Sequence, residues 1–488
     1  MLLLSLSLFA TADAASLDLL EVGGEFGGPG AQNPTAIWWN PAGLAVGGGH
    51  QFLVQGSPIF ATVNFDRANP NYGDPVDLDG DGTIDSYDYG GADTVKFTGV
   101  VPFVGASSDF GVDGLGVGFG LFAPTARGGS EVDPPGSGSY FLREGNIQAV
   151  YTSLGVAYQI ADIVAIGASG NYVDSTWHAV TDVEVLSTVQ PLLGGFAEFQ
   201  DQEFEADGYR STITFDHLKD RVFSFGTGIY ITPLDMLGIS VAYQHGLKLN
   251  HEGDLNLKTN CAPEYSNLQS ALEITGLCDA DLNGTGRVPY TLPSRVHGAV
   301  VLHPIEKLRL EAMGGWVGWS AFDNYQLNID IPPEAFVDVA DTGVQQSSSE
   351  LASQQRNWAR DNVDSFWLGF DGKFKPLPVL TTGAKVVYDK SAIPDRVVST
   401  NNFDGNTVTT TLSGAVGLKQ LTIGLAYAHT FFPKRTVTNS AYSLTLDNIT
   451  EDGVIDSAAE PYFFPSANGT YTATIDRIGL TIAGTFGK

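Results

Sequence analysis

Apolar and polar residues alternate along much of this chain. Between residues 237 and 250 the odd positions are mostly large and apolar, as at Leu237, Ile239 and Leu249, and the even positions are small or polar. The same two-residue period returns at 421–428 and at 478–486. Because successive side chains of a β-strand point to opposite faces, each stretch predicts a strand with one apolar face. The first stretch is long enough to cross a membrane when tilted.

The predicted strands are joined alternately by short and long connections. Tight turns are expected at residues 107–113, 161–163, 232–236, 303–307, 375–378 and 419–420. Long polar segments lie between them, at roughly 67–92, 125–145, 181–218, 252–292, 319–362, 390–405 and 433–470. Six turns join twelve strands, and a first strand near 50–66 and a last near 471–486 bring the number to fourteen. Short turns at one end and long loops at the other are typical of outer-membrane barrels.

Composition favours a membrane barrel over a soluble β-sandwich. Only 16% of the residues are charged, whereas a quarter is typical, and the chain has 58 glycines and 11% aromatic residues. A soluble sandwich also alternates, but its outward face carries more Lys and Glu than these strands contain. We therefore expect an all-β protein, a transmembrane antiparallel β-barrel of about 14 strands.

The N-terminus predicts export. Residues 2–10 form an apolar run that is too short to span a bilayer as a helix, and Ala12-Asp13-Ala14 follows as a small-x-small cleavage site. We expect a signal peptide at 1–14, an N-terminal segment at 15–49 and a barrel at 50–488. The predicted location is the outer membrane of a bacterial cell, crossed many times, with the membrane lipid and the barrel-assembly machinery as partners.

The charge balance bears on partners. The chain has 25 basic and 55 acidic residues, a net charge of −30, and nucleic-acid binding needs a positive surface. We expect no nucleic-acid partner. Acidic loops exposed to the outside would attract divalent cations.

The stretch Trp38-Trp39-Asn40-Pro41-Ala42-Gly43-Leu44 lies in a Gly- and Pro-rich segment before the first predicted strand, where neither a helix nor a central strand is expected. With this stretch ahead of fourteen strands, the sequence resembles the FadL/TodX family of outer-membrane transporters for long-chain fatty acids and other hydrophobic compounds. Members of that family begin with a compact hatch that ends in an Asn-Pro-Ala motif.

The resemblance implies passive transport through a plugged barrel. The hatch would close the lumen, with gating residues Trp38, Trp39, Asn40, Pro41, Ala42 and Gly43. A hydrophobic ligand would enter from outside and leave through a side opening that a kink in the third strand creates. Residues 114–123, the expected third strand, carry four alternating glycines that either bend the strand or make room for the hatch. Asn40-Pro41 has the alternative interpretation of a simple entry turn into the first strand.

The first long loop contains a calcium-binding pattern. Residues 77–88 match the twelve-residue loop of an EF-hand, with oxygen ligands at the usual positions and Gly82 at the turn. The expected Ca²⁺ ligands are Asp77, Asp79, Asp81, Thr83, Asp85 and Asp88. Because Pro75 and Gly90-Gly91 flank the loop, no helix pair is expected, and the ion would act as a structural staple. The alternative is a solvated acidic loop.

Cysteine usage fits an oxidising compartment. The only two cysteines, Cys261 and Cys278, lie close together in a predicted long loop. We expect them to form one disulfide that closes this loop.

Other functions have less support. The chain has no G-x-S-x-G and no H-E-x-x-H motif, so we do not expect an enzyme, although a Ser–His pair assembled across strands stays open. An adhesive or structural outer-membrane protein with Ca²⁺-stabilised acidic loops, a channel specific for aromatic hydrocarbons and a general porin are the alternatives. Ligand-binding residues are not assigned; Trp316, Trp319, Phe366 and Trp367 fit either a pocket or an outer aromatic girdle.

Overall fold

The computed structural model describes residues 22–68, 91–131, 138–139, 141–184, 210–258, 281–335, 355–440 and 467–487. The expected signal peptide at 1–14, the calcium loop at 77–88 and both cysteines lie outside these residues.

The described residues form strands almost throughout. The strand segments are β1 His50–Arg67, β2 Gly91–Ser108, β3 Leu115–Glu131, β4 Glu144–Ile160, β5 Val164–Glu184, β6 Arg210–Leu234, β7 Leu237–Gln244, β8 Leu247–Lys258, β9 Asp281–Leu292, β10 Arg295–Ile305, β11 Leu308–Val317, β12 Asn324–Asp330, β13 Gln355–Ala359, β14 Ser365–Leu377, β15 Leu380–Asp389, β16 Thr407–Leu418, β17 Leu421–Phe431, β18 Arg435–Val437 and β19 Gly469–Phe486. The short helices are η1 Gly24–Phe26, α1 Ala36–Trp39, α2 Gly43–Gly47, η4 Trp319–Ala321, η5 Pro333–Ala335 and η6 Asp395–Val397.

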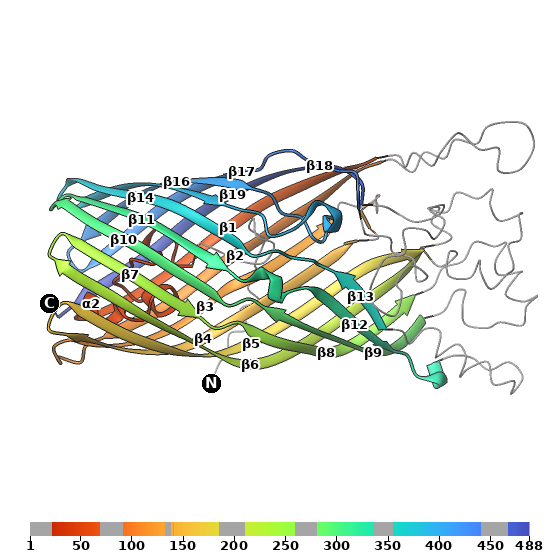
Figure 1. The fold of residues 1–488 in the computed structure, drawn as a ribbon, viewed down its shortest axis with the longest axis horizontal. Helices are drawn as coiled ribbons and strands as arrows, with labels where there is room; N and C mark the ends of the chain where they lie inside the picture. The colour runs from red at the N-terminus through yellow and green to blue at the C-terminus, as the bar shows by residue number, and fades with distance from the viewer. Residues whose placement is uncertain are drawn as a thin grey trace, which may run out of the picture.

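These segments make a closed barrel. Five of them continue the preceding strand after a short break (β8, β10, β12, β14 and β18), so the nineteen segments of the described chain make fourteen strands. Every pairing is antiparallel, and β1 pairs with both β2 and β19, which closes the sheet. The tight turns gather at the left end of Figure 1, where the C-terminus also lies. The predicted fourteen strands and the turn positions are confirmed.

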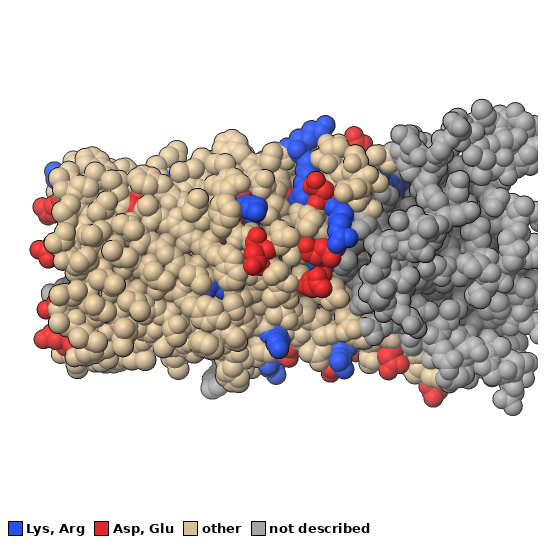
Figure 2. Space-filling view, in the orientation of Figure 1, with Lys and Arg blue, Asp and Glu red and all other residues tan. Residues whose placement is uncertain are grey.

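The outer surface is apolar over a broad band. The outward positions carry large side chains with exposed fractions such as 67% at Leu154, 53% at Val241 and 59% at Leu425. On the face drawn in Figure 2, Lys, Arg, Asp and Glu are nearly missing from this band and gather at its two ends. The predicted alternation thus places its apolar side toward lipid, as in outer-membrane barrels. Among the described residues no helix is long and apolar enough to cross a membrane.

Some strand breaks, such as the one between β7 and β8, reverse which positions face inward beyond the apolar band. The sequence pattern predicts one continuous apolar face from Leu237 to Leu249, but this prediction is wrong beyond residue 245. Leu247 and Leu249 are 2% exposed and point inward, whereas Val241 points outward. The break falls at Gly246, where a Cβ would clash with the Leu292 carbonyl oxygen. Past the break the barrel is apolar inside and polar outside, as expected of a wall that stands in water.

Candidate functional site

The N-terminal segment, residues 22–49, is built from short helical turns. The expectation that this segment has no helix is wrong in detail, because Trp38 and Trp39 end helix α1 and Gly43 begins helix α2. Asn40 is extended, with φ −161° and ψ 102°. A residue that precedes proline disfavours the helical region, so Asn40-Pro41 separates the two turns. Figure 1 shows the segment in red inside the barrel, at the end with the tight turns.

Asn40 fastens this segment to the barrel wall. Its Nδ2 donates to the Ile229 carbonyl and to Ser240 Oγ, both at 2.9 Å, while its Oδ1 accepts the Ala42 N–H at 3.1 Å. Ser240 Oγ in turn donates to the Pro29 carbonyl. The Asn40 side chain is fully buried, so losing these bonds leaves buried polar groups without partners, at about 1–3 kcal/mol each.

The two tryptophans fill the space between the segment and the wall. Trp39 Nε1 donates to the Val22 carbonyl at 2.8 Å, and Trp38 packs edge-on against Tyr151 with ring centroids 5.5 Å apart. The Arg295 guanidinium lies 5.2 Å from the Trp38 ring centroid, a cation–π contact. Both tryptophans are at most 3% exposed.

Glycines on the inner face of the barrel leave the space that the N-terminal segment occupies. A Cβ on Gly116 of β3 or Gly167 of β5 would clash with backbone atoms at Leu44-Ala45 or Pro41-Ala42, and one on Gly228 of β6 would clash with Asn40 Oδ1. The third-strand glycines therefore make room for the segment, which decides between the two interpretations that the sequence left open. The strand distortion lies elsewhere, at residues 123–124.

Charged residues on β11 and β14 hold the start of the segment. Glu311 Oε1 accepts the Gly30 N–H at 2.9 Å, and Arg309 donates to Glu311 at 2.6 Å and to the Gly30 carbonyl at 3.3 Å. Lys373, which lies 3.5 Å from Asp371, donates to the Glu25 carbonyl. The end of the segment is fastened at the β2–β3 turn, where Asp109 accepts the Gly49 N–H at 2.5 Å. Backbone hydrogen bonds from Gly111 and Gly49 lower the pKa of Asp109, so this carboxylate stays ionised.

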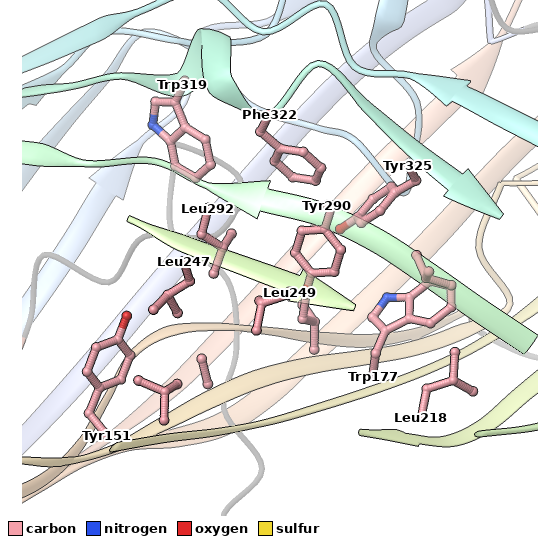
Figure 3. Close-up of a cluster of buried hydrophobic side chains, with 14 of the residues drawn as sticks. Tyr151, Trp177, Leu218, Leu247, Leu249, Tyr290, Leu292, Trp319, Phe322 and Tyr325 are labelled. Carbon is pink, nitrogen blue, oxygen red and sulfur yellow. The ribbon is translucent and has the colours of Figure 1, made fainter. Parts of the chain in front are cut away.

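An apolar cluster lines the interior above the tryptophans. Figure 3 shows the rings of Tyr290, Phe322 and Tyr325 turned toward one another, with Leu247, Leu249 and Trp177 beside them. Tyr290 and Tyr325 meet edge-on with ring centroids 5.0 Å apart. Leu247, Leu249 and Tyr290 lie inward because the β7–β8 and β9–β10 breaks shift the alternation, so alternation alone did not predict them. Trp177 and Tyr325 keep the inward parity of β5 and β11.

The sequence left two positions open, the interior and the outer surface, for Trp316, Trp319, Phe366 and Trp367, and the structure places two residues in each. Trp319 and Trp367 are 0% and 3% exposed and face the interior, whereas Trp316 and Phe366 are 45% and 41% exposed and face outward. Each pair in the sequence therefore supplies one residue to the interior and one to the outer surface.

The barrel wall has a gap between β2 and β3. These strands pair only between Val95-Lys96 and Ser130-Glu131 and again between 103–108 and 117–122, which leaves 97–102 and 123–129 without pairing to each other. The gap carries Pro102 on one strand and Pro124 on the other, and proline has no N–H to donate to a ladder. β3 also bulges against β4 between Phe122 and Thr125.

Two Ser–His pairs form across strands in the described residues. His50 Nδ1 lies 2.8 Å from Ser108 Oγ at the exposed turn end of β1 and β2, and the second pair is buried. His251 Nε2 lies 2.9 Å from Ser175 Oγ, but this hydroxyl also donates to the Gln148 carbonyl at 3.1 Å. His251 and Ser175 are fully buried, and His251 Nδ1 has no carboxylate partner among the described residues. A catalytic pair needs a base oriented by a third group, so this geometry fits a structural hydrogen bond. In the described part of the chain, no cluster of three His, Cys, Asp or Glu side chains is placed to hold a metal.

Comparison with protein families identifies the chain. The model of the outer membrane protein transport protein family (OMPP1/FadL/TodX) matches residues 5–463. The chain belongs to this family. It is therefore an outer-membrane transport protein, as the sequence predicted. No curated protein sequence matches it.

Solved structures share the FadL/TodX fold along nearly the whole chain. A crystal structure of a Pseudomonas aeruginosa FadL homologue has a TM-score of 0.71 at 16% identity, over 98% of this chain and 99% of that one. The Pseudomonas putida toluene transporter TodX has a TM-score of 0.61 at 12% identity, over 98% of each chain. The Ralstonia pickettii toluene transporter TbuX has a TM-score of 0.57 at 13% identity, over 93% of this chain and 94% of that one. At these identities the likeness shows the fold.

Proposed function

We propose that this protein carries hydrophobic molecules passively across the outer membrane through a hatch-gated barrel with a lateral exit. The observation that carries the proposal is a pair of features in one barrel: residues 22–49 fill its interior, and the wall beside them is interrupted between β2 and β3. An occupied interior together with an interrupted wall fits cargo that leaves sideways into the bilayer.

Residues 22–49 are the hatch in this proposal, with Trp38, Trp39, Asn40, Pro41, Ala42 and Gly43 as its gating residues. The support is that residues 22–49 contact the wall through side-chain packing and hydrogen bonds, among them those of Asn40, which can be broken and remade. No strand pairing ties these residues to the sheet. Ligand would collect on the apolar cluster around Tyr290 and Phe322 and pass to the gap when the hatch shifts.

Two classes of cargo fit an apolar interior, long-chain fatty acids and aromatic hydrocarbons. Solved relatives in the fold include toluene transporters and a FadL homologue, so both classes belong in the first assay. A hydrophobic small molecule is the proposed ligand in either case.

Three predictions from the sequence concern residues that the structure does not describe, and we propose them here. We infer that residues 77–88 bind one structural Ca²⁺ and that Cys261 and Cys278 form a disulfide. Each would stiffen a long loop. The signal peptide at 1–14 belongs with them.

Uptake in cells that lack their own transporter tests the proposal. Radiolabelled oleate and radiolabelled toluene are supplied separately, and the intact protein is compared with an Asn40→Ala, Pro41→Ala variant at equal surface levels. We expect uptake of at least one compound by the intact protein and a changed rate in the variant. Absence of uptake of both compounds would refute hydrophobic transport, and equal rates would reduce Asn40-Pro41 to a turn.

A further inference from the structure

The connection between β15 and β16, residues 390–406, folds into the barrel interior. Val397 and Val398 are fully buried, and Ile393 and Phe403 are 3% and 7% exposed. A loop that merely joined two strands at the surface would leave such side chains in water. In Figure 1 this connection is drawn in blue at the half of the barrel away from the tight turns.

The buried side of this segment belongs to the cluster behind the β2–β3 gap. That cluster contains Phe97 and Val101 of β2, from the stretch without pairing to β3, and Ala126, from the facing stretch of β3. It also contains the four large apolar residues of the segment: Ile393, Val397, Val398 and Phe403. A ligand that leaves the interior through the gap meets this packing first.

The segment holds its own shape. Asp404 Oδ2 accepts the Ala392 N–H at 3.0 Å, Asn402 Nδ2 donates to the Val397 carbonyl at 2.7 Å, and Asn402 and Ser399 exchange backbone hydrogen bonds. Burial raises the pKa of Asp404 to about 6. These internal bonds hold the fold of the segment, so it can move as a unit once the bonds from neighbouring strands to its carbonyl groups are released.

Arg435 makes more of the polar attachments of this segment to the wall than any other side chain. The others include the Val363 N–H, which donates to the Ala392 carbonyl at 2.8 Å, Arg360, which donates to the Asn401 carbonyl at 3.5 Å, and an Arg396–Asp361 ion pair at 2.8 Å. Arg435 of β18 donates to the Ile393 carbonyl at 2.5 Å, to the Asp404 carbonyl at 2.6 Å and to Asp395 Oδ1 at 2.8 Å. On the far side, Thr400 Oγ1 donates to the Gly138 carbonyl at 3.3 Å. An arginine fork that spans both ends of the segment fixes its position more firmly than a single hydrogen bond does.

We propose that residues 390–406 form a removable inner cover of the β2–β3 gap and that Arg435 is the residue that positions it. The inference rests on the proposed lateral exit. The cover packs apolar side chains against the gap, as a hydrophobic ligand would. A passing ligand replaces this packing at little cost in exposed apolar surface.

A reversible disulfide lock that holds residues 390–406 in place tests whether this segment must move during transport. Thr400 Cγ2 lies 3.0 Å from the position of a Cβ on Gly138. A sulfur in place of this methyl group therefore lies close enough for a Gly138→Cys, Thr400→Cys pair to join in a disulfide, once the Asp93 side chain, which lies closer still to the same Cβ position, moves aside. Uptake of oleate and toluene is measured with the lock oxidised and after mild reduction, and binding is followed by tryptophan quenching. The reduced form controls for disturbance of Asp93, which bonds to Gly138, and reduced intact protein controls for the native cysteines.

We expect the oxidised lock to bind ligand normally, to lose uptake and to recover it on reduction. Unchanged uptake in the oxidised form would overturn the cover, and so would loss of binding, because the segment would then belong to the entrance. If the intact protein itself takes up neither compound, the proposed function fails rather than the cover.

Thiol labelling gives a second test that needs no lock. Thr400 is fully buried, so Thr400→Cys should react slowly with a small polar maleimide in intact cells. Adding Arg435→Gln should raise the labelling rate several-fold. Arg221→Gln is the matched control, because Arg221 pairs with Asp174 at 2.9 Å on the outer surface. Equal labelling in the two backgrounds would show that Arg435 does not position the segment.

Discussion

At the residue scale, glycines on the inner face of the barrel determine where the N-terminal segment can pack. Gly116, Gly167 and Gly228 lie on three different strands, and each leaves room for backbone or side-chain atoms of the N-terminal segment. In the sequence they look like any small residues on an inward face. Only the tertiary structure shows that a methyl group at these positions would displace the stretch around Asn40.

Substitution of Gly167 by alanine should therefore open the barrel. The added methyl group would clash with Pro41-Ala42, and overpacking of this kind costs about 2 kcal/mol. Because this cost falls on the docked state, the ratio of undocked to docked molecules rises about thirtyfold. Single-channel conductance in planar bilayers measures the change.

Gly170→Ala provides the control on the same strand, because nothing lies within 4 Å of its Cβ position. Its conductance should match that of the unchanged protein. If Gly167→Ala also conducts normally, the segment tolerates displacement without opening and its role as a hatch is weakened.

At the element scale, one extra residue in β3 accounts for the gap. From Phe122 to Ser130 the strand takes eight steps, whereas β2 takes seven between the paired residues Lys96 and Phe103. Against β4, the step from Phe122 to Thr125 is likewise one residue too long. A bulge leaves its extra residue unpaired and disrupts the ladder, and here a proline occupies the bulged stretch.

Deletion of Pro124 should restore the register of β3 with both neighbours. The deletion removes the extra step and the residue without an N–H at once, so pairing with β2 can become continuous. We expect ligand binding to persist and uptake to fall to the background of cells without the protein. Replacement of Pro124 by alanine, which keeps the extra residue, should retain most of the uptake; a deletion variant that transports normally would place the exit elsewhere.

At the scale of the whole molecule, the barrel exchanges its faces along its length. The part nearer the tight turns is apolar outside, where Leu154 and Leu425 are 67% and 59% exposed. The part nearer the long loops is apolar inside, where Leu247 and Leu249 are 2% exposed. The outer surface of the part nearer the tight turns suits lipid hydrocarbon, and the outer surface of the part nearer the long loops suits water. The exchange explains how one sheet can lie in lipid and still offer an apolar interior to a ligand.

A charge placed in the lipid-facing band should destabilise the fold in proportion to its depth. Leu154→Arg puts a cation near the middle of β4 and should cost about 2–4 kcal/mol, whereas Phe110→Arg at the β2–β3 turn should cost about 1 kcal/mol or less. Phe110 is 69% exposed, so the two sites differ in depth rather than in burial. Unfolding by urea in lipid vesicles measures both, and equal costs would contradict the membrane position of the band.

The sequence by itself determined the barrel, its fourteen strands, the turn positions and the kinship carried by Asn40-Pro41-Ala42, because two-residue alternation and turn chemistry are local properties. The tertiary structure alone decided which face each residue takes after a strand break. It placed Gly246 against the Leu292 carbonyl oxygen, and it brought Arg435 to residues 390–406. It also located the gap at Pro102 and Pro124. These features depend on register between strands far apart in the chain, and no local pattern records register.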